Sequence, residues 1–236
     1  ITYASRPFPP GEYWLEDRAR CRPPACPADF ARAVRENLTG SGLLLTRDFE
    51  TFIRAGRLTD PCLDDRDVVL FPERIDGRYL MLHRPMQWTG PEYGTEHPAI
   101  WIASGTDLLG MRESQLLASA RYDWECKIGG NTPPLRTPHG WLSLYHAVGP
   151  DARYRLGALL LDLDDPTQVR HRTPHWLMEP RADYELDGPH RGCIFPCGKV
   201  VLNDTLFVYY GAADRHVALA TCNLPELLDH LRSCPG

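Results

Sequence analysis

The feature that most constrains the fold is a polar turn followed by an apolar strand, which recurs along the chain at nearly equal spacing. Gly77, Gly140 and Asp204 each stand at the start of such a strand, at offsets of 63 and 64 residues. A second theme, an apolar strand that ends in small or acidic residues, recurs just under every 60 residues. It is found at 42–49, 99–108, 157–166 and 217–224. A period near 60 with about four strands per unit and little helix is typical of a β-propeller. A β-sandwich would place turns at shorter intervals, without this recurrence.

We therefore predict an all-β chain that forms a single β-propeller domain over residues 1–236, with an incomplete first unit. Ile1–Ser5 is expected to be an inner strand of that unit. Residues 6–40 interrupt the pattern and are expected to be a loop insertion that carries one short helix, Pro27–Leu38, because its apolar residues follow helical spacing. The chain starts without an initiator Met, and we expect further residues upstream of Ile1.

Composition excludes several classes of function. A formal net charge of −5 argues against a nucleic-acid surface, which normally needs a basic face. No run approaches the roughly 18 apolar residues of a membrane span. The eight cysteines include no CxxC pair, so neither a zinc site nor a redox motif is expected. Cys21/Cys26 and Cys193/Cys197 remain open as disulfide or metal pairs, but reduced, mostly buried thiols of a cytoplasmic protein are the favoured interpretation.

A charged hairpin over 64–85 is the first candidate for a functional site. An apolar strand at Val68–Phe71, a turn at Asp76-Gly77 and a second strand at Arg78–His83 predict two antiparallel strands. Arg66 and Asp67 come just before the first strand, and His83 and Arg84 end the second, so the hairpin brings these charges to one rim. Paired guanidiniums suit an anionic ligand. The alternative for each charge alone is a solvated surface salt bridge.

In a propeller, loops from successive units meet at one end of the axis, where ligands bind. The equivalent rim positions are Arg66, Asp67 and Arg84 in one unit, Lys127 and Tyr145-His146 in the next, and Tyr209 to Asp214 in the last. Lysine occurs only twice in the chain, at Lys127 and Lys199. The presence of two arginines and one lysine at the same end of the propeller axis predicts a binding site for an oxyanion the size of phosphate or sulfate.

Several long runs, in order, resemble glycoside hydrolase family 130, the β-mannoside phosphorylases. The resemblance extends over nearly the whole chain from Leu43 onward. The runs are RDVVLFPERIDGRYLMLHRP (66–85), WECKIGG (124–130), TPHGWLSLYHAV (137–148), YRLGALLLDLDDP (154–166) and IFPCGKVVLNDTLFVYYGAAD (194–214).

This resemblance implies a five-bladed β-propeller with its first blade incomplete here. It places the phosphate site on Arg66, Arg84 and Lys127, with Tyr145 and His146 lining it. Asp214 matches an aspartate that contacts the mannose ring, and Asp67 and Tyr210 are also expected to bind the sugar substrate. No catalytic residue is assigned within the chain, because the family's general acid is an aspartate in a Glu-Asp-Pro-Arg motif upstream of Ile1.

The function implied is an inverting phosphorylase that cleaves a β-mannoside with inorganic phosphate to give α-mannose 1-phosphate. The alternatives are a β-mannoside hydrolase on the same fold and a non-catalytic carbohydrate-binding propeller. Family members that hydrolyse their substrate lack some of these phosphate-binding cations. Because this chain has all three, Arg66, Arg84 and Lys127, the resemblance favours phosphorolysis. We expect that the protein needs no cofactor and no metal and uses inorganic phosphate as a co-substrate. Its expected binding partner is a β-mannoside oligosaccharide, and neither nucleic acid nor a membrane is expected to bind. A homo-oligomer is left open.

Overall fold

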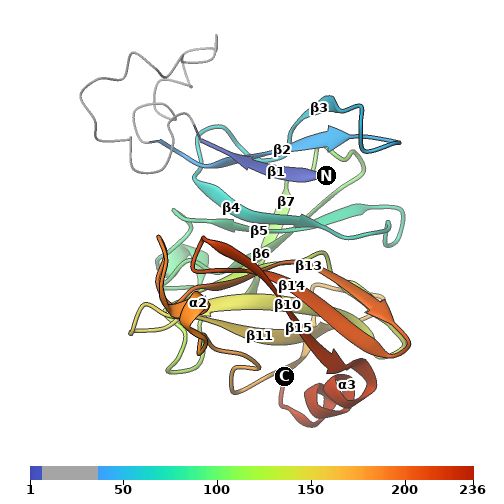
Figure 1. Cartoon of the computed structure of the whole chain (residues 1–236). Coiled ribbons are helices and arrows are strands. Elements are labelled where there is room, and N and C mark those ends of the chain that lie inside the picture. The colour runs from blue at the N-terminus through green and yellow to red at the C-terminus, as the bar shows by residue number, and fades with distance from the viewer. Residues whose placement is uncertain (7–36) are drawn as a thin grey trace, which may run out of the picture.

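The computed structural model describes residues 1–6 and 37–236, and in these ranges the fold consists of four antiparallel β-sheets with little helix (Figure 1). The all-β prediction is confirmed. The short helix predicted for Pro27–Leu38 lies outside the described residues except for its last two positions, which are not helical. Among the described residues, no helix combines the length and apolar character needed to cross a membrane.

The first two sheets come from residues 2–118. The first has the order β1-β2-β3, and its strands are β1 Thr2–Ser5, β2 Gly40–Leu45 and β3 Ile53–Arg57. Ser5 pairs with Gly40, so the segment between β1 and β2 starts and ends at neighbouring positions. The second sheet has the order β4-β5-β6-β7, formed by β4 Asp65–Leu70, β5 Tyr79–Pro85, β6 Ile100–Gly105 and β7 Glu113–Ala118, with a short 3-10 turn, η2 Pro91–Tyr93, between β5 and β6.

The other two sheets come from residues 127–223. The third has the order β12-β11-β10-β8, and β9 also pairs with β10. Its strands are β8 Lys127–Gly130, β9 Leu135–Thr137, β10 Gly140–Val148, β11 Tyr154–Leu161 and β12 Val169–Arg172. The fourth has the order β13-β14-β15, with β13 Ile194–Leu202, β14 Thr205–Ala212 and β15 His216–Asn223. Two helices accompany these sheets, α2 Asp183–Leu186 and α3 Leu224–Ser233.

The recurring turns of the sequence each lie directly before an inner strand of a sheet, namely β5, β10 and β14. Asp76 and Gly77 join β4 to β5 with φ of 49° and 73°, and Asn203 and Asp204 join β13 to β14 with φ of 48° and 61°. Two consecutive left-handed residues are the geometry that a tight hairpin requires, because its twist then matches that of the strands. The period of about 60 residues thus corresponds to one sheet per unit.

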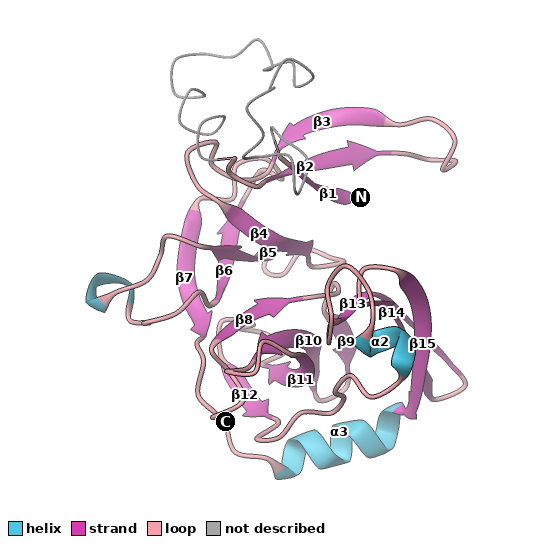
Figure 2. Cartoon of the chain, turned by 60° about the vertical axis from the view of Figure 1, so that its left-hand side comes forward, coloured by secondary structure: helices cyan, strands magenta, loops and turns pink. Residues whose placement is uncertain are grey.

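Each sheet packs mainly on its neighbours in the chain. β10 is buried along its whole length because it lies between two sheets. Trp141 of β10 packs with Leu82 of β5 in one apolar cluster, whereas Leu144 packs with Val208 of β14 in another. A third cluster joins the first two sheets through Leu43 and Met81, among others. Figure 2 shows the four sheets following one another in an arc from β1–β3 to β13–β15.

We expect Trp141→Ala to lower the free energy of unfolding by about 3–5 kcal/mol, measured by urea denaturation. The indole is 1% exposed, meets the ring of Phe71 edge-on at a centroid distance of 5.3 Å, and donates its Nε1–H to the Leu163 carbonyl at 3.1 Å. The matched control is Trp176→Ala, in a loop, where the indole is 37% exposed. It should cost less than about 1 kcal/mol. Equal losses would contradict the placement of Trp141 in the core between sheets.

Candidate functional site

The β4–β5 hairpin positions its charged residues differently from the sequence prediction. At the ends away from the turn the strands extend past the predicted bounds, to Asp65 in β4 and to Pro85 in β5, so that Arg66 and Arg84 lie inside the sheet as direct partners. The register shifts between Arg66 and Val69, and Asp67 adopts a left-handed φ of 55° within this bulge. A bulge redirects side chains locally. It turns the Asp67 carboxylate toward Arg84.

Asp67, Arg84 and His146 form a buried cluster. The Oδ2 atom of Asp67 lies 2.5 Å from Nε of Arg84 and 3.7 Å from Nε2 of His146. His146 is fully buried, and burial lowers its pKa to about 3, although the Asp67 charge opposes the shift. The imidazole is therefore neutral at physiological pH. The Nη1 atom of Arg84 is buried without a hydrogen-bond partner in the described structure, and a buried guanidinium donor of this kind can bind an anion.

Gly129 allows this cluster to form, and the sequence analysis assigned it no role. It pairs with His146 across β8 and β10. A Cβ atom at this position would lie 2.0 Å from Oδ2 of Asp67 and 2.9 Å from Nε of Arg84. No real side chain tolerates such contacts, so only glycine lets the carboxylate and guanidinium approach β8. The signal in the sequence was the Gly-Gly pair directly after Lys127 and Ile128.

Arg66 and Lys127 add positive charge around the buried cluster. The Arg66 guanidinium makes a two-point contact with Asp64, at 2.8 and 2.6 Å, and this hydrogen bonding raises its pKa. Burial lowers the pKa of Lys127, and the charges of Arg84 and Arg66 lower it further. Lys127 therefore lies close enough to Arg66 and Arg84 for their charges to affect its pKa.

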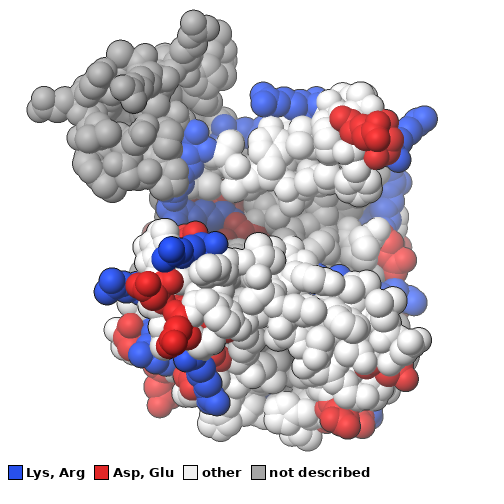
Figure 3. Space-filling view, viewed as in Figure 1, with Lys and Arg blue, Asp and Glu red and all other residues white. Residues whose placement is uncertain are grey.

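Arg6 is a fourth cation, which the sequence analysis did not identify. Its Nε donates to Oγ1 of Thr39 at 2.6 Å, and its pKa is lowered by burial and by the charge of Arg66. Four cationic side chains (Arg6, Arg66, Arg84 and Lys127) therefore surround two carboxylates (Asp64 and Asp67), which leaves an excess of two positive charges. Like charges held together in a partly buried site are favourable only with a counter-anion. Figure 3 shows basic and acidic side chains in the hollow between β1–β3 and the sheets below it.

Aromatic rings close one side of the cluster. The ring of Tyr154, the first residue of β11, stacks on His146 at 5.4 Å, and Nζ of Lys127 lies 5.6 Å from the Tyr154 ring centroid. Phe195 of β13 contacts His146 at a centroid distance of 4.8 Å. Tyr154 opens the family-like run at 154–166, which was the signal available in the sequence, but no residue of that run was assigned a role. Its hydroxyl is a further polar group beside the cations.

Tyr145 does not join this site, which corrects the prediction that it lines the phosphate site. Successive residues of a strand point to opposite faces, so His146 and Tyr145 diverge. The Tyr145 hydroxyl donates to Oε1 of Glu125 at 2.7 Å and accepts from Nε of Arg172 at 3.2 Å. Glu125 and Arg172 form a buried ion pair at 2.7 Å. Tyr145 therefore completes a buried polar network between sheets.

Tyr210 is also turned away from the cations. It is 3% exposed, lies in the cluster between the third and fourth sheets, and donates its hydroxyl to Oε1 of Glu185 in α2 at 2.7 Å. Asp214, by contrast, is exposed in the left-handed turn between β14 and β15, with a φ of 54°. Burial and the Asp214 charge raise the pKa of Cys193 to about 12, and Lys127 opposes this shift. Asp214 and Lys127 thus both lie near Cys193.

Among the described cysteines, Cys126, Cys193, Cys197, Cys222 and Cys234 are free thiols, as predicted. The pair Cys21/Cys26 lies outside the described residues. Of the six cysteines in the described ranges, Cys193 and Cys234 are buried and the other four are not, so the prediction of mostly buried thiols is wrong for this part of the chain. Within the described ranges, no group of three or more His, Cys, Asp or Glu side chains is arranged to hold a metal ion.

Residues 37–233 match the family model of glycoside hydrolase family 130, which is described as β-1,4-mannooligosaccharide phosphorylase. The chain belongs to glycoside hydrolase family 130. The resemblance stated from the motifs is therefore confirmed.

Two curated relatives illustrate this similarity. The β-1,2-mannobiose phosphorylase of Listeria innocua is 39% identical over 84% of this chain and 55% of its own length. The β-1,4-mannooligosaccharide phosphorylase of Ruminococcus albus is 32% identical over 81% of this chain and 57% of its own. The chain thus spans about half the length of the curated relatives it matches.

Solved structures agree with the family assignment. The Listeria innocua enzyme in complex with β-1,2-mannobiose superposes with a TM-score of 0.75 over 84% of this chain and 55% of that chain, at 39% identity. A structure from work on family 130 hydrolases that target β-1,2-mannosidic linkages in Candida mannan gives 0.68 over 79% and 58%, at 20% identity, which supports the fold alone.

Gly129→Ala should lower the free energy of unfolding by about 1–3 kcal/mol, because the new methyl group collides with Asp67 and Arg84. Gly130→Ala is the matched control, one residue further along β8. Its Cβ would meet Leu82 and Val69 at 3.6 Å, an ordinary van der Waals distance. Urea denaturation of both variants provides the measurement, and an equal response would mean that β8 does not press against the charged cluster.

The low pKa of His146 predicts a specific pH dependence. The unfolded chain binds a proton below about pH 6.5 whereas the folded imidazole stays neutral, so stability present above that pH is lost as the pH falls toward 3. Between pH 6.5 and 5 the wild-type chain should lose about 2 kcal/mol more than His146→Gln, at about 1.4 kcal/mol per pH unit. If the free energies of unfolding of the two proteins changed in parallel with pH, His146 would not be a buried neutral histidine.

Proposed function

We propose that the protein containing this chain is an inverting β-mannoside phosphorylase. It transfers the mannosyl group of a β-mannoside to inorganic phosphate and releases α-mannose 1-phosphate and a shortened sugar. The observation that carries this proposal is the cationic cluster centred on Arg84 and Asp67, which has an excess of positive charge and a buried, unpartnered guanidinium donor. The names of the relatives at 39% and 32% identity support the reaction class.

In this proposal Arg66, Arg84 and Lys127 hold the phosphate, and neutral His146 and Tyr154 border it. One phosphate oxygen attacks the anomeric carbon from the face opposite the leaving group, the glycosidic C–O bond breaks, and the leaving oxygen takes a proton from a general acid. The 236 residues contain no Glu-Asp-Pro-Arg motif, so that acid is proposed to lie upstream of Ile1. The cations stabilise the charge on the nucleophile and hold it in line.

The substrate-binding roles are revised by the geometry. Asp214, exposed at the end of β14 near Lys127 and Cys193, is kept as the proposed ligand of the mannose ring. Asp67 is proposed to position Arg84 and His146 rather than to bind sugar, since its carboxylate is 8% exposed and engaged by both. Tyr210 is not kept as a sugar ligand, because its hydroxyl is bonded to Glu185.

We further propose that the whole protein is a five-bladed β-propeller, of which this chain supplies four sheets. An uncovered apolar face at one end of the arc supports this. Val200, Leu202, Tyr209, Val217 and Leu219 are exposed on the outer face of β13–β15. Figure 3 shows the surface over these strands almost free of charged side chains. Because exposed apolar patches mark surfaces that bind something, a further blade is the proposed cover. The free thiols of Cys126, Cys193, Cys197, Cys222 and Cys234 support a cytoplasmic location.

Calorimetric titration of this chain with inorganic phosphate tests the anion site. Arg84→Ala should weaken binding roughly ten- to hundredfold, because a charged hydrogen bond is worth about 1.5–3 kcal/mol. Arg136→Ala, which removes an exposed arginine that pairs with Glu73 on the surface, is the control and should bind phosphate as the wild type does. If both variants bind phosphate as the wild type does, the anion site lies elsewhere.

The reaction itself is tested with the full-length protein and β-linked mannobiose. Phosphorolysis requires that sugar release depends on added phosphate and that mannose 1-phosphate is formed in equal amount, as followed by ³¹P NMR. Equal sugar release with and without phosphate would instead support the hydrolase alternative. Binding without any turnover would support the non-catalytic one.

A further inference from the structure

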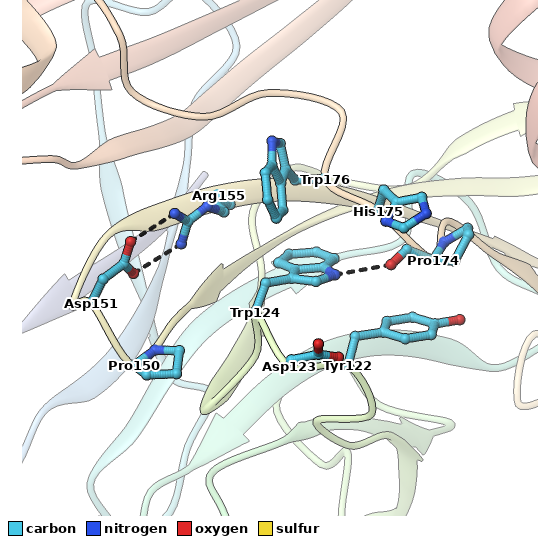
Figure 4. Close-up of a pocket in the computed structure, with 9 residues that line it drawn as sticks. All are labelled: Tyr122, Asp123, Trp124, Pro150, Asp151, Arg155, Pro174, His175 and Trp176. Atoms are coloured by element: carbon cyan, nitrogen blue, oxygen red, sulfur yellow. Dashed lines mark hydrogen bonds and ion pairs between the residues drawn. The ribbon is translucent and has the colours of Figure 1, made fainter.

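A second concave site lies apart from the cation cluster, on the opposite face of the β10–β11 hairpin. It is a groove of about 580 Å³ at the ends of β8, β11 and β12. Tyr154 and Arg155 are consecutive in β11 and therefore point to opposite faces, so Tyr154 borders the cations and Arg155 borders the groove. Figure 4 shows the lining residues, which are Tyr122, Asp123, Trp124, Pro150, Asp151, Arg155, Pro174, His175 and Trp176. Such a volume accommodates one or two sugar rings.

The aromatic wall of this groove is rigid. Trp124 is held by a hydrogen bond from its Nε1 to the Pro174 carbonyl at 3.0 Å and by stacking on Tyr145 at 6.0 Å. Trp176 meets Trp124 edge-on at 6.1 Å, and the Arg155 guanidinium lies 4.8 Å from the Trp176 ring centroid. Trp176 nevertheless remains 37% exposed. An aromatic ring fixed from two sides yet open to solvent binds the apolar face of a pyranose at little cost in entropy.

The polar lining excludes an anionic ligand. Arg155 is neutralised by two hydrogen bonds to Asp151, at 2.9 and 2.7 Å, and by a further one to Glu179 at 3.4 Å. Asp123 is an additional exposed carboxylate in the lining, and the described lining contains no second arginine or lysine. The lining is therefore slightly negative, unlike the cation cluster. Fixed carboxylates beside an aromatic ring suit the hydroxyl groups of a neutral sugar.

We propose that this groove is a secondary binding site for a neutral oligosaccharide, with a pyranose ring on Trp176 and its hydroxyl groups bonded to Asp123 and Asp151. The site needs no phosphate and takes no part in bond cleavage. It would keep the chain on a longer substrate between encounters with the cation cluster. The proposal does not depend on the phosphorolysis assignment, because a hydrolase or a binding protein gains from it equally.

The test is titration calorimetry of this chain with β-linked mannotetraose, in the Arg84→Ala background and without phosphate. Trp176→Ala should weaken binding at least tenfold, and Trp176→Phe should recover part of the loss. Tyr209→Ala is the matched control, because Tyr209 is a similarly exposed aromatic residue, at 44%, on a flat sheet face. It should leave the affinity unchanged.

Three results would overturn the proposal. They are no detectable oligosaccharide binding, equal affinities for Trp176→Ala and its parent, and a self-associated chain that sedimentation shows to dissociate on Trp176→Ala. The last would make the groove an interface between copies of this chain. The single variant Trp176→Ala, with Arg84 intact, should bind phosphate with the affinity of the wild type. A failure of the oligosaccharide proposal can therefore be told apart from a failure of the anion-site proposal.

Discussion

The architecture of the site depends on one carboxylate. Asp67 lies in a strand bulge with a left-handed backbone, and its Oδ2 atom is shared between Arg84 and His146. A buried guanidinium without a counter-charge would be prohibitively unfavourable, so this contact is what allows Arg84 to stand inside the protein with a free donor. The close approach of the hairpin to β8, possible only at Gly129, then brings Lys127 to the same place. The Asp67–Arg84 ion pair and the close approach of the β4–β5 hairpin to β8 therefore depend on each other.

The stacking of sheets converts this local contact into a site. β10 is packed on both faces, and its alternation sends Trp141 and Leu144 into different apolar clusters. The same alternation separates His146, which faces the cations, from Tyr145, which is bonded to Glu125. A shift of one residue in the pairing of β10 would exchange these two faces and destroy both the site and the core. The stable core and the proposed anion site therefore depend on the same register of β10.

Much of the fold could be predicted from the sequence, since the turns at Gly77 and Gly140 recur at a fixed period and periodicity survives without any tertiary information. The proximity of Arg66 and Arg84 could also be predicted, because a hairpin brings its ends together whatever its detailed register. Lys127 was expected beside them from the repeat, since it occupies the equivalent position of the next unit. The orientation of Tyr145 could not, since it depends on which face of a doubly buried strand meets which neighbour. Arg6 was missed because its proximity to Arg66 depends on how β1 packs on β4.

The account rests on a single anion held jointly by groups from two neighbouring sheets. The most direct measurement is a crystal structure of this chain soaked with tungstate, whose anomalous signal locates a tetrahedral oxyanion without ambiguity. We predict a single strong peak within hydrogen-bonding reach of Nη1 of Arg84 and close to Nζ of Lys127, with Arg66 on its other side. A peak elsewhere, or a site between these cations that stays empty while tungstate binds at the surface, would contradict the account.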